Sequence, residues 1–274
     1  MRGHNLRYAV NLSILFTELD LLDRPAAAKA AGFDAVEFWW PFGTATPRAT
    51  EVNAFVAAIT DADVRLVGLN FFAGDLAAGE RGVVSLPRRV DEFKAGVDLA
   101  VEIGRVLHCP AFNALYGNRI DAASAAEQDA VALGALRYAA KAVADIGATV
   151  LLEPVSGIPS YPLRTAADVI TVLDNVGAPN IGLLADLYHL AVNGDDVAEA
   201  ITKHTDRIAH VQIADAPGRG EPGSGDLPLD DWLEALAANG YDGYVAAEYK
   251  PTVRSTDSFG WVGSTQPSAN TVEE

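Results

Sequence analysis

The feature that most constrains the fold is a repeated alternation of short apolar runs, rich in β-branched residues, with longer alanine-rich stretches. Such an alternation predicts parallel strands, because each strand then returns to the sheet through a crossover helix. Strands are expected over residues 8–13, 35–39, 65–71, 106–111, 149–153, 181–186, 208–214 and 244–249. Helices are expected over residues 21–31, 51–61, 88–104, 123–146, 166–176, 197–204 and 229–239.

Eight strands, with the helix after the last one weak or missing, predict an α/β fold of the (β/α)8 TIM-barrel type. The chain has 274 residues, close to the ~250 that such a barrel uses, and no break in composition marks a second domain. We therefore expect one barrel domain over residues 1–251. Residues 252–274 are expected to form a loosely ordered tail, in which Phe259 and Trp261 could dock on the barrel. A doubly wound dinucleotide-binding sheet is disfavoured because no G-x-G-x-x-G follows the first strand.

Charge and cysteine content disfavour several classes of protein. A formal net charge of −17 repels polyanions, which argues against nucleic-acid and anionic-membrane partners. Cys109 is the single cysteine, so neither an intramolecular disulfide nor a thiolate zinc cluster is expected. Neither a membrane span nor an apolar signal segment is recognisable. The default expectation is a cytoplasmic protein that acts on a small molecule, and a homo-oligomer is compatible with this.

Oxygen-bearing side chains stand at the ends of four consecutive predicted strands. They are Glu153, Asp186, Gln212 and Glu248. Active sites of TIM barrels form at these strand ends, and side-chain alternation points all four residues inward. Three carboxylates converging in the barrel mouth would repel one another, which a divalent cation would resolve. Because all four donors are oxygens, if Gln212 uses its carbonyl, the pattern favours Mg²⁺ or Mn²⁺ over Zn²⁺.

Other residues near the strand ends are candidates for contacts with a substrate. His189 lies one helical turn after Asp186 and could bond a substrate oxygen, or could simply fill the barrel rim. Arg219 could hold a substrate carboxylate by a bidentate bond, or could form an ion pair inside its own loop with Glu221 or Asp226. Further candidates for the pocket are Trp39, Trp40, Asn70, Phe72, Asn113 and Tyr116.

Two buried polar residues are expected to support the site. His210 shares the inward face of its strand with Gln212 but lies deeper in the barrel, so we expect it to orient neighbouring groups or to be structural. Glu37 could play a similar supporting role at the end of the second strand. Cys109 is expected to be a small core residue.

Six segments of the sequence, taken together, resemble the hydroxypyruvate isomerases. They are EFWWPF (37–42), AGDLAAGERG (73–82), LLEPVSGIPSYPL (151–163), DLYHLAVNGDD (186–196), HVQIADAPGRGEPGSGDL (210–227) and GYDGYVAAEYKP (240–251). These enzymes belong to the xylose-isomerase-like TIM-barrel superfamily, which also holds ketose 3-epimerases and an endonuclease branch. The epimerases usually have histidine at the position of Gln212. The sequence departs from the superfamily's E-P-x-N or E-P-x-E at Ser156.

The resemblance implies that Glu153, Asp186, Gln212 and Glu248 hold the metal, and that Glu153 and Glu248 form the acid–base pair. The implied reaction interconverts hydroxypyruvate and tartronate semialdehyde through an enediolate. An isomerase or epimerase of a four-carbon 2-oxo acid (2-oxo-tetronate), a ketose 3-epimerase and a non-catalytic sugar-acid-binding barrel remain alternatives. The endonuclease branch is disfavoured by the net charge of −17 and by the scarcity of histidine, of which the chain has five.

Overall fold

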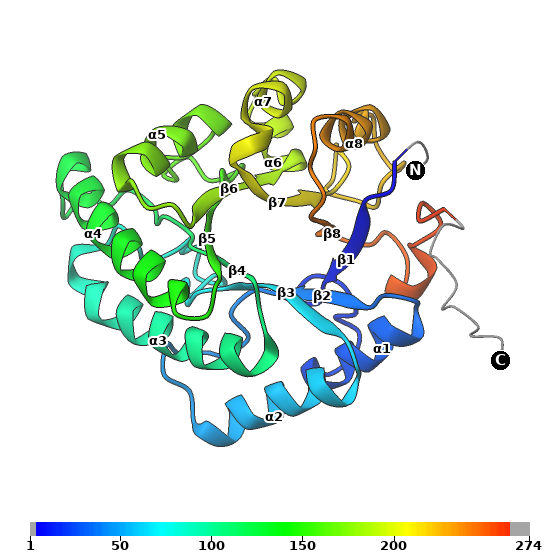
Figure 1. The fold of residues 1–274 in the computed structure, drawn as a ribbon, viewed down its shortest axis with the longest axis horizontal. Helices are drawn as coiled ribbons and strands as arrows, with labels where there is room; N and C mark the ends of the chain where they lie inside the picture. The colour runs from blue at the N-terminus through cyan, green and yellow to red at the C-terminus, as the bar shows by residue number, and fades with distance from the viewer. Residues whose placement is uncertain (1–3, 264–274) are drawn as a thin grey trace.

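The computed structural model describes residues 4–263 and forms a closed parallel barrel in the strand order β1-β2-β3-β4-β5-β6-β7-β8. The helices form an outer ring around the strands (Figure 1). The strands are β1 (Arg7–Asn11), β2 (Ala35–Phe38), β3 (Arg65–Asn70), β4 (Ala111–Asn113), β5 (Thr149–Leu152), β6 (Ile181–Asp186), β7 (Ile208–Ile213) and β8 (Tyr244–Ala247). The predicted TIM barrel is thereby confirmed.

The helices are α1 (Arg24–Ala30), α2 (Ala49–Asp61), α3 (Val90–Leu107), α4 (Ala125–Ala144), α5 (Ala166–Val176), α6 (Leu187–Val192), α7 (Val197–His204) and α8 (Leu229–Ala238). After β8 the described chain contains no α-helix and only a short 3-10 turn, Ser255–Asp257. This agrees with the prediction that the helix after the last strand is weak or missing. No helix within residues 4–263 has the length and apolar character needed to span a membrane.

Several boundaries coincide with the predicted ranges, and one strand was predicted wrongly. The ranges of β6, α5 and α7 agree with the sequence-based expectation at both ends. The fourth strand was placed over residues 106–111, but α3 runs on to Leu107 and β4 begins only at Ala111. The helix continues through Gly104, where a side chain would overlap the ring of Phe112, and ends at His108 in the left-handed conformation (φ 54°). Glycine at 104 serves close packing rather than termination.

The inward-facing side chains of the strands form two layers in the barrel interior. The deeper layer is largely apolar and contains Ala9, Ala35, Val67, Ala111, Leu151, Leu184 and Ala246. Polar side chains follow two residues later on most strands, at their carboxyl ends, because side chains two residues apart share a face. We call the deeper layer the floor and the polar layer the mouth.

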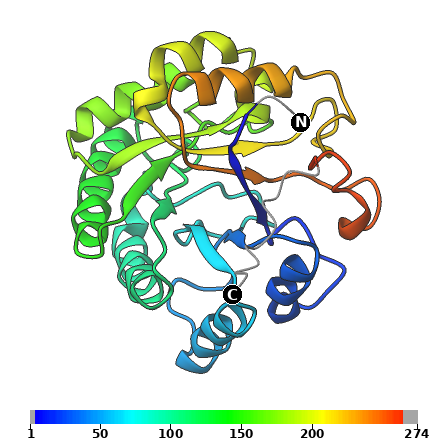
Figure 2. The ribbon, with the colours of Figure 1, turned by 45° about the vertical axis from the view of Figure 1, so that its right-hand side comes forward.

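The C-terminal segment that follows β8 packs against the start of the chain. Phe259 lies between the rings of Phe16 and Phe33, at centroid distances of 5.8 Å and 4.8 Å. Trp261 meets the rings of Tyr8 and Tyr249 edge-on. Figure 2 shows this red segment beside β1 and α1. Residues 264–274 of the predicted tail lie outside the described residues.

Candidate active site

The mouth of the barrel receives one buried polar side chain from the end of each strand. Together they are Asn11, Glu37, Asn70, Asn113, Glu153, Asp186, Gln212 and Glu248. The four residues predicted as metal ligands, which come from β5, β6, β7 and the end of β8, all lie in this ring. Parallel closure of the barrel explains the convergence, because all eight carboxyl ends then meet at one rim.

Glu153 and Asp186 form the part of the mouth that is best arranged to hold a cation. Donor atoms of Glu153, Asp186 and His189 lie within 4.8 Å of one another. Asn113 donates from Nδ2 to Glu153 Oε2 at 2.7 Å, which fixes one side of that carboxylate. Asp186 caps α6 by accepting the backbone N–H of His189 at 3.1 Å, so the first helical turn brings the imidazole over the two carboxylates.

The imidazole of His189 is held in one tautomer by the loop after β5. Its Nδ1 accepts the backbone N–H of Ser156 at 3.0 Å and lies 2.7 Å from the Ser156 hydroxyl. A backbone N–H can only donate, so Nδ1 carries no proton and the neutral ring has its proton on Nε2. Nε2 lies 3.8 Å from Glu153 Oε1 and 3.6 Å from Asp186 Oδ2. A protonated Nε2 is a hydrogen-bond donor and a poor metal ligand, which suits the predicted contact with a substrate oxygen.

A second group of mouth residues is joined by hydrogen bonds around Glu37. Its Oε1 accepts from Asn11 at 2.9 Å and from Gln212 at 2.5 Å. Its Oε2 lies 2.7 Å from Nε2 of His210. Glycine at position 68 makes room for this carboxylate, because a Cβ there would stand 3.2 Å from Glu37 Oε2. These contacts link Glu37 and His210 to the predicted ligand Gln212, and the supporting role expected for both stays a prediction.

The network around Glu37 fixes which way the Gln212 amide points. The amide nitrogen donates to both Glu37 and Glu248. The carbonyl oxygen is buried and has no hydrogen-bond partner among the described residues. A buried oxygen without a partner is unfavourable unless something else binds it. The oxygen of Gln212, beside carboxylates, therefore fits a hard divalent cation, as does the oxygen-only set of predicted ligands.

Arg219 reaches into the mouth from the loop between β7 and α8. Its Nη2 donates to Glu248 Oε1 at 2.5 Å and lies 3.5 Å from Asp186 Oδ2. Its buried Nε has no partner among residues 4–263 and is free to bind another group. The ion pair with Glu221 that had been considered is absent from the described ion pairs, since Glu221 bonds the backbone N–H and hydroxyl of Thr252 instead.

Burial and crowding of like charges shift the proton affinities of the mouth residues. Burial, together with the charge of Asp186, raises the pKa of Glu153 to about 8. Burial also raises the pKa of Glu248 well above its usual value, against the opposing effect of Arg219. Burial lowers the pKa of His189 to about 4, so its ring is neutral at pH 7. Burial opposes the charge on Arg219, but Glu248 and Asp186 outweigh it and raise the pKa of the guanidinium.

Of the three remaining residues predicted to contact a substrate, one lies in the mouth and two lie outside it. Asn70 is buried at the end of β3, in the ring of mouth residues. Trp39 is half-buried after β2 and borders a cavity of about 710 Å³ that Lys250 and Arg254 also line. The hydroxyl of Tyr116 is committed to Asp129 of α4, at 2.7 Å, and is not joined to the carboxylates.

Three residues that position the site were given no such role from the sequence, although Ser156 was noted as a departure from the superfamily's pattern. Asn11 bridges Glu37 and Glu248, with donor distances of 2.9 Å and 3.0 Å. Ser156 fixes the tautomer of His189. Tyr161, fully buried, donates to the backbone carbonyl of Glu153 at 3.1 Å. Asn11 could have been found by reading the end of the first strand as the last four strands were read. Ser156 and Tyr161 lie in a loop, where side-chain alternation does not predict which residues point toward the site.

Comparison with known proteins identifies relatives along almost the whole chain. Residues 25–264 match the family model described as xylose isomerase-like TIM barrel. A Streptomyces coelicolor protein named "Putative hydroxypyruvate isomerase" is 51% identical over 93% of this chain and 95% of its own. A Cupriavidus necator protein named 2-oxo-tetronate isomerase is 36% identical over 93% and 97%. A crystal structure from Brucella melitensis, described as an AP endonuclease of family 2, is 31% identical with a TM-score of 0.86, over 94% of this chain and 98% of that one.

Proposed function

This chain belongs to the xylose isomerase-like TIM-barrel family, and we propose that it is a metal-dependent isomerase that interconverts hydroxypyruvate and tartronate semialdehyde. The observation that carries the proposal is the pair of buried glutamates, Glu153 and Glu248, which the ends of β5 and β8 bring into one mouth beside Asp186. Burial raises the pKa of both carboxyl groups, and a carboxyl group whose pKa is raised can both take and return a proton. An isomerase of this kind needs such a pair.

The reaction transfers protons within one substrate molecule. A base removes a proton from the carbon that bears the hydroxyl, C3 of hydroxypyruvate, and leaves an enediolate. A proton is then delivered to C2, while the proton of the C3 hydroxyl moves to the oxygen on C2. Glu153 and Glu248 are proposed to carry out the two carbon-proton transfers, and positioned groups of this kind contribute ~10²–10⁴-fold in rate.

The metal is proposed to be Mg²⁺ or Mn²⁺, held by Glu153, Asp186, Gln212 and Glu248. This is supported by the close donor atoms of Glu153 and Asp186 and by the free, buried carbonyl oxygen of Gln212. When bound, such a cation stabilises the negative charge that develops on adjacent substrate oxygens.

Two side chains are proposed to orient the substrate, the hydrogen-bond donor His189 and the cation Arg219. His189 carries its proton on Nε2, directed toward the carboxylates, and can donate it in a hydrogen bond to a substrate oxygen. Arg219 has a buried Nε without a partner among the described residues, next to the Nη2 that touches Glu248. This Nε can hold the substrate carboxylate close to the acid–base pair.

A second candidate substrate is the four-carbon 2-oxo-tetronate. The relative from Cupriavidus necator carries that activity in its name and is 36% identical to this chain. A cavity of about 710 Å³, lined by Ser13, Trp39 and Lys250, lies close to the ends of β1, β2 and β8.

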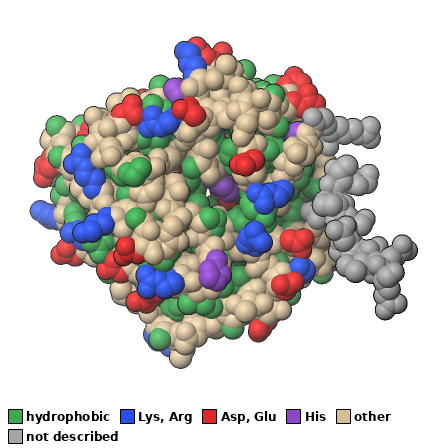
Figure 3. Space-filling view, viewed as in Figure 1, with side chains coloured by type: hydrophobic (Ala, Val, Ile, Leu, Met, Phe, Trp, Pro, Cys, Tyr) green, Lys and Arg blue, Asp and Glu red, His purple; other side chains and the backbone are tan. Residues whose placement is uncertain are grey.

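An endonuclease activity is disfavoured, although one similar structure is described in that way. The net charge of −17 opposes binding to a polyanion. On the face drawn in Figure 3, Lys and Arg side chains lie scattered among Asp and Glu and form no continuous basic surface. The predicted ligands are oxygens, whereas the endonuclease reading requires several histidine ligands for zinc.

The proposal is tested by supplying the purified protein with hydroxypyruvate and Mg²⁺ or Mn²⁺ and following the aldehyde proton by NMR. Turnover that stops on addition of a chelator is the expected result. Absence of turnover, or turnover that ignores the chelator, contradicts the proposal. The same assay with 2-oxo-tetronate and with C5 and C6 ketoses ranks the alternatives by kcat/KM. A non-catalytic binding barrel would bind the acids without converting any of them.

A further inference from the structure

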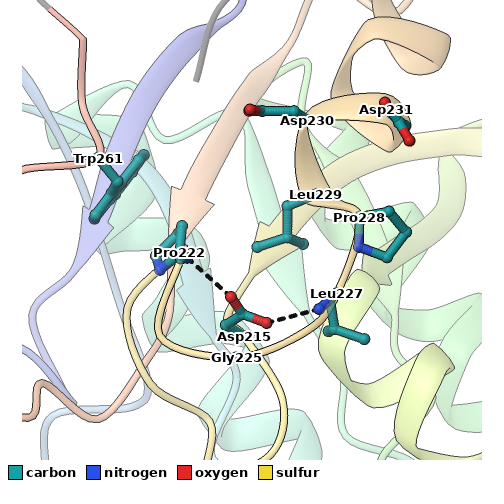
Figure 4. A pocket seen from close by; sticks show the side chains of 10 residues that line it. Asp215, Pro222, Gly225, Leu227, Pro228, Leu229, Asp230, Asp231 and Trp261 are labelled. Atoms are coloured by element: carbon teal, nitrogen blue, oxygen red, sulfur yellow. Dashed lines mark hydrogen bonds between the residues drawn. The ribbon is translucent and has the colours of Figure 1, made fainter.

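The loop between β7 and α8, residues 214–228, owes its shape to one buried carboxylate. Asp215 is 1% exposed, and its two oxygens accept three backbone N–H groups of its own loop. Oδ1 accepts from Ala216 at 2.8 Å and from Leu227 at 3.0 Å, and Oδ2 accepts from Gly223 at 2.8 Å. Figure 4 shows the carboxylate between the two arms of the loop, with dashed lines to both. Asp215 thus joins the beginning, the middle and the end of the loop.

From outside, the hydrogen bonds of Thr252 to Glu221 hold the middle of the loop, and none of them reaches both of its ends as Asp215 does. A cavity of about 430 Å³ borders it, lined by Asp215, Pro222, Gly225 and Trp261, so the loop does not rest on a filled core at this side. On the side of β8, Lys250 donates its backbone N–H to the carbonyl of Arg219 at 2.7 Å. A loop beside a cavity depends strongly on its own hydrogen bonds, and charged acceptors form the strongest of these.

The residue that this loop carries into the mouth is Arg219. Its backbone has a positive φ of 59°, an uncommon conformation for a residue with a side chain. The loop must therefore be held in shape for Nη2 to stay within 2.5 Å of Glu248 and 3.5 Å of Asp186. The backbone N–H of Asp215 also donates to the carbonyl of Gly220, directly after Arg219, at 2.9 Å.

We propose that Asp215 is a positioning residue that holds the Arg219 guanidinium against Glu248 and Asp186, and so sets both the cation affinity of the mouth and the placement of the substrate carboxylate. The part that concerns the substrate rests on the proposed function. The part that concerns cation binding rests only on the proposed metal site, and it is measured without turnover through the effect of the Arg219 charge beside two carboxylates. A positive group at that distance competes with a bound cation.

The sign of the effect on Mn²⁺ binding distinguishes this role from a simple change of charge. Removing a negative charge near a cation site should weaken binding of the cation. If Asp215 acts through Arg219, Asp215→Asn instead releases the guanidinium and tightens Mn²⁺ binding. The expected change is about threefold for Asp215→Asn and ~10-fold for Arg219→Gln. Asp226→Asn is the matched control, since Asp226 is exposed in the same loop and its carboxylate takes no part in a described hydrogen bond.

The experiment titrates Mn²⁺ into each folded variant by calorimetry and then measures kcat and KM with hydroxypyruvate. In the Arg219→Gln background, Asp215→Asn should change neither the Mn²⁺ affinity nor KM further. Tightening by Asp215→Asn alone, with a raised KM and no additional effect in the double variant, supports the proposal. Weaker or unchanged Mn²⁺ binding by a folded Asp215→Asn, or full additivity with Arg219→Gln, overturns it.

A second variant covers the case in which Asp215→Asn does not fold. A Cβ on Gly225 would overlap the carbonyl of Ala216 and the Asp215 carboxylate, so Gly225→Ala displaces that carboxylate while keeping its charge. It should tighten Mn²⁺ binding in the same direction, and unchanged or weaker binding contradicts the proposal. If the unaltered protein fails to convert hydroxypyruvate, the proposed function is wrong, whereas the Mn²⁺ titrations still decide the role of Asp215.

Discussion

The floor and the mouth of the barrel interior are built on the same strands and the same inward face, yet they have opposite chemistry. The floor clusters hold small or aliphatic side chains, such as Ala35, Leu151 and Leu184. Two residues further on, the same strands present Glu37, Glu153 and Asp186. Packing is thus concentrated in one layer and ionisable groups in the next, so that charge can be gathered at the mouth without disturbing the layer that closes the barrel.

His210 is the exception that joins the two layers. It stands at floor level on β7, below Gln212, and its Nε2 lies 2.7 Å from Glu37 in the mouth. The mouth itself has two kinds of polar group. The carboxylate of Glu37 is satisfied by Asn11, Gln212 and His210, whereas the carbonyl oxygens of Gln212 and Asn113 are buried without a partner among the described residues. The hydrogen-bonded groups orient their neighbours, whereas the polar atoms without a partner are the ones available to bind a ligand.

The largest expected effect comes from removing an acid–base group of the mouth. Glu153→Gln should lower kcat with hydroxypyruvate by about 10²–10⁴-fold, because the amide cannot exchange a proton at this position. Stability should be retained or improved, since a buried carboxylate whose pKa is raised to about 8 is replaced by a neutral group that Asn113 can still bond. Steady-state kinetics and thermal unfolding check both expectations.

The control for this change is Glu102→Gln, on the exposed face of α3, which should leave kcat and the unfolding temperature unchanged. A Glu153→Gln protein that stays folded and turns over at the original rate would remove the mouth's proposed role in catalysis.

The next effect concerns the cation. Asp186→Asn keeps a good N-cap for α6, because the amide oxygen can still accept the backbone N–H of His189. It removes the charge that a cation requires, and the loss of Mn²⁺ affinity should exceed the ~10–100-fold typical of residues that only orient a ligand. Calorimetric titration measures the affinity.

Asp196→Asn provides the matched control, since Asp196 caps α7 in the same way, through the N–H of Glu199 at 2.9 Å, but lies outside the mouth. It should leave Mn²⁺ affinity unaltered. Equal affinities for the two variants would show that Asp186 serves only its helix.

The barrel and the facing of its strand ends could be predicted from sequence because they depend on local periodicity. A period of two decides which side of β7 faces inward, so Gln212 and His210 were assigned correctly to the interior. Periodicity does not say which inward residues meet. Glu37 bonds Gln212 and His210, which are more than 170 positions away in the chain, only because the barrel closes with β8 and β1 between β7 and β2.

The boundary of β4 and the role of Arg219 could not be predicted for different reasons. Val106 is β-branched and suggested a strand, but it is 61% exposed on the outer face of α3, where packing of the rest of the helix overrides its preference. Arg219 was expected either to bind substrate or to pair inside its loop. Its contact with Glu248 depends on the shape of the loop between β7 and α8. The glycines and prolines of that loop predict irregular structure but not its particular shape.

A smaller effect is expected on the pH dependence of stability, because the mouth contains titratable carboxyl groups and the floor clusters do not. The folded-state pKa of Glu153 is raised, to about 8, above its unfolded value. The folded protein therefore holds more protons than the unfolded one between about pH 4.5 and 8. Its stability is highest below the unfolded pKa and falls as pH rises toward the folded one.

In chelator, the unfolding temperature should thus fall between about pH 5 and 8, and saturating Mn²⁺ should reduce this slope, because a bound cation favours the charged carboxylate. Differential scanning calorimetry at several pH values measures it. The slope should also be smaller in Glu153→Gln. An identical slope in that variant would assign the pH dependence to other groups.

The smallest effect on activity is expected from the floor, even where the effect on stability is large. Leu151→Ala removes a 1% exposed side chain that packs with Ala111 and Leu184. It should lower the free energy of unfolding by about 2–5 kcal/mol, through lost burial and the cavity left behind. Because Glu153 is held independently by Asn113 and, through its carbonyl, by Tyr161, kcat per folded molecule should change little. Denaturant unfolding and kinetics at low temperature separate the two quantities. A large fall in kcat at full folding would mean that the floor positions the glutamate, and that the two layers are not independent.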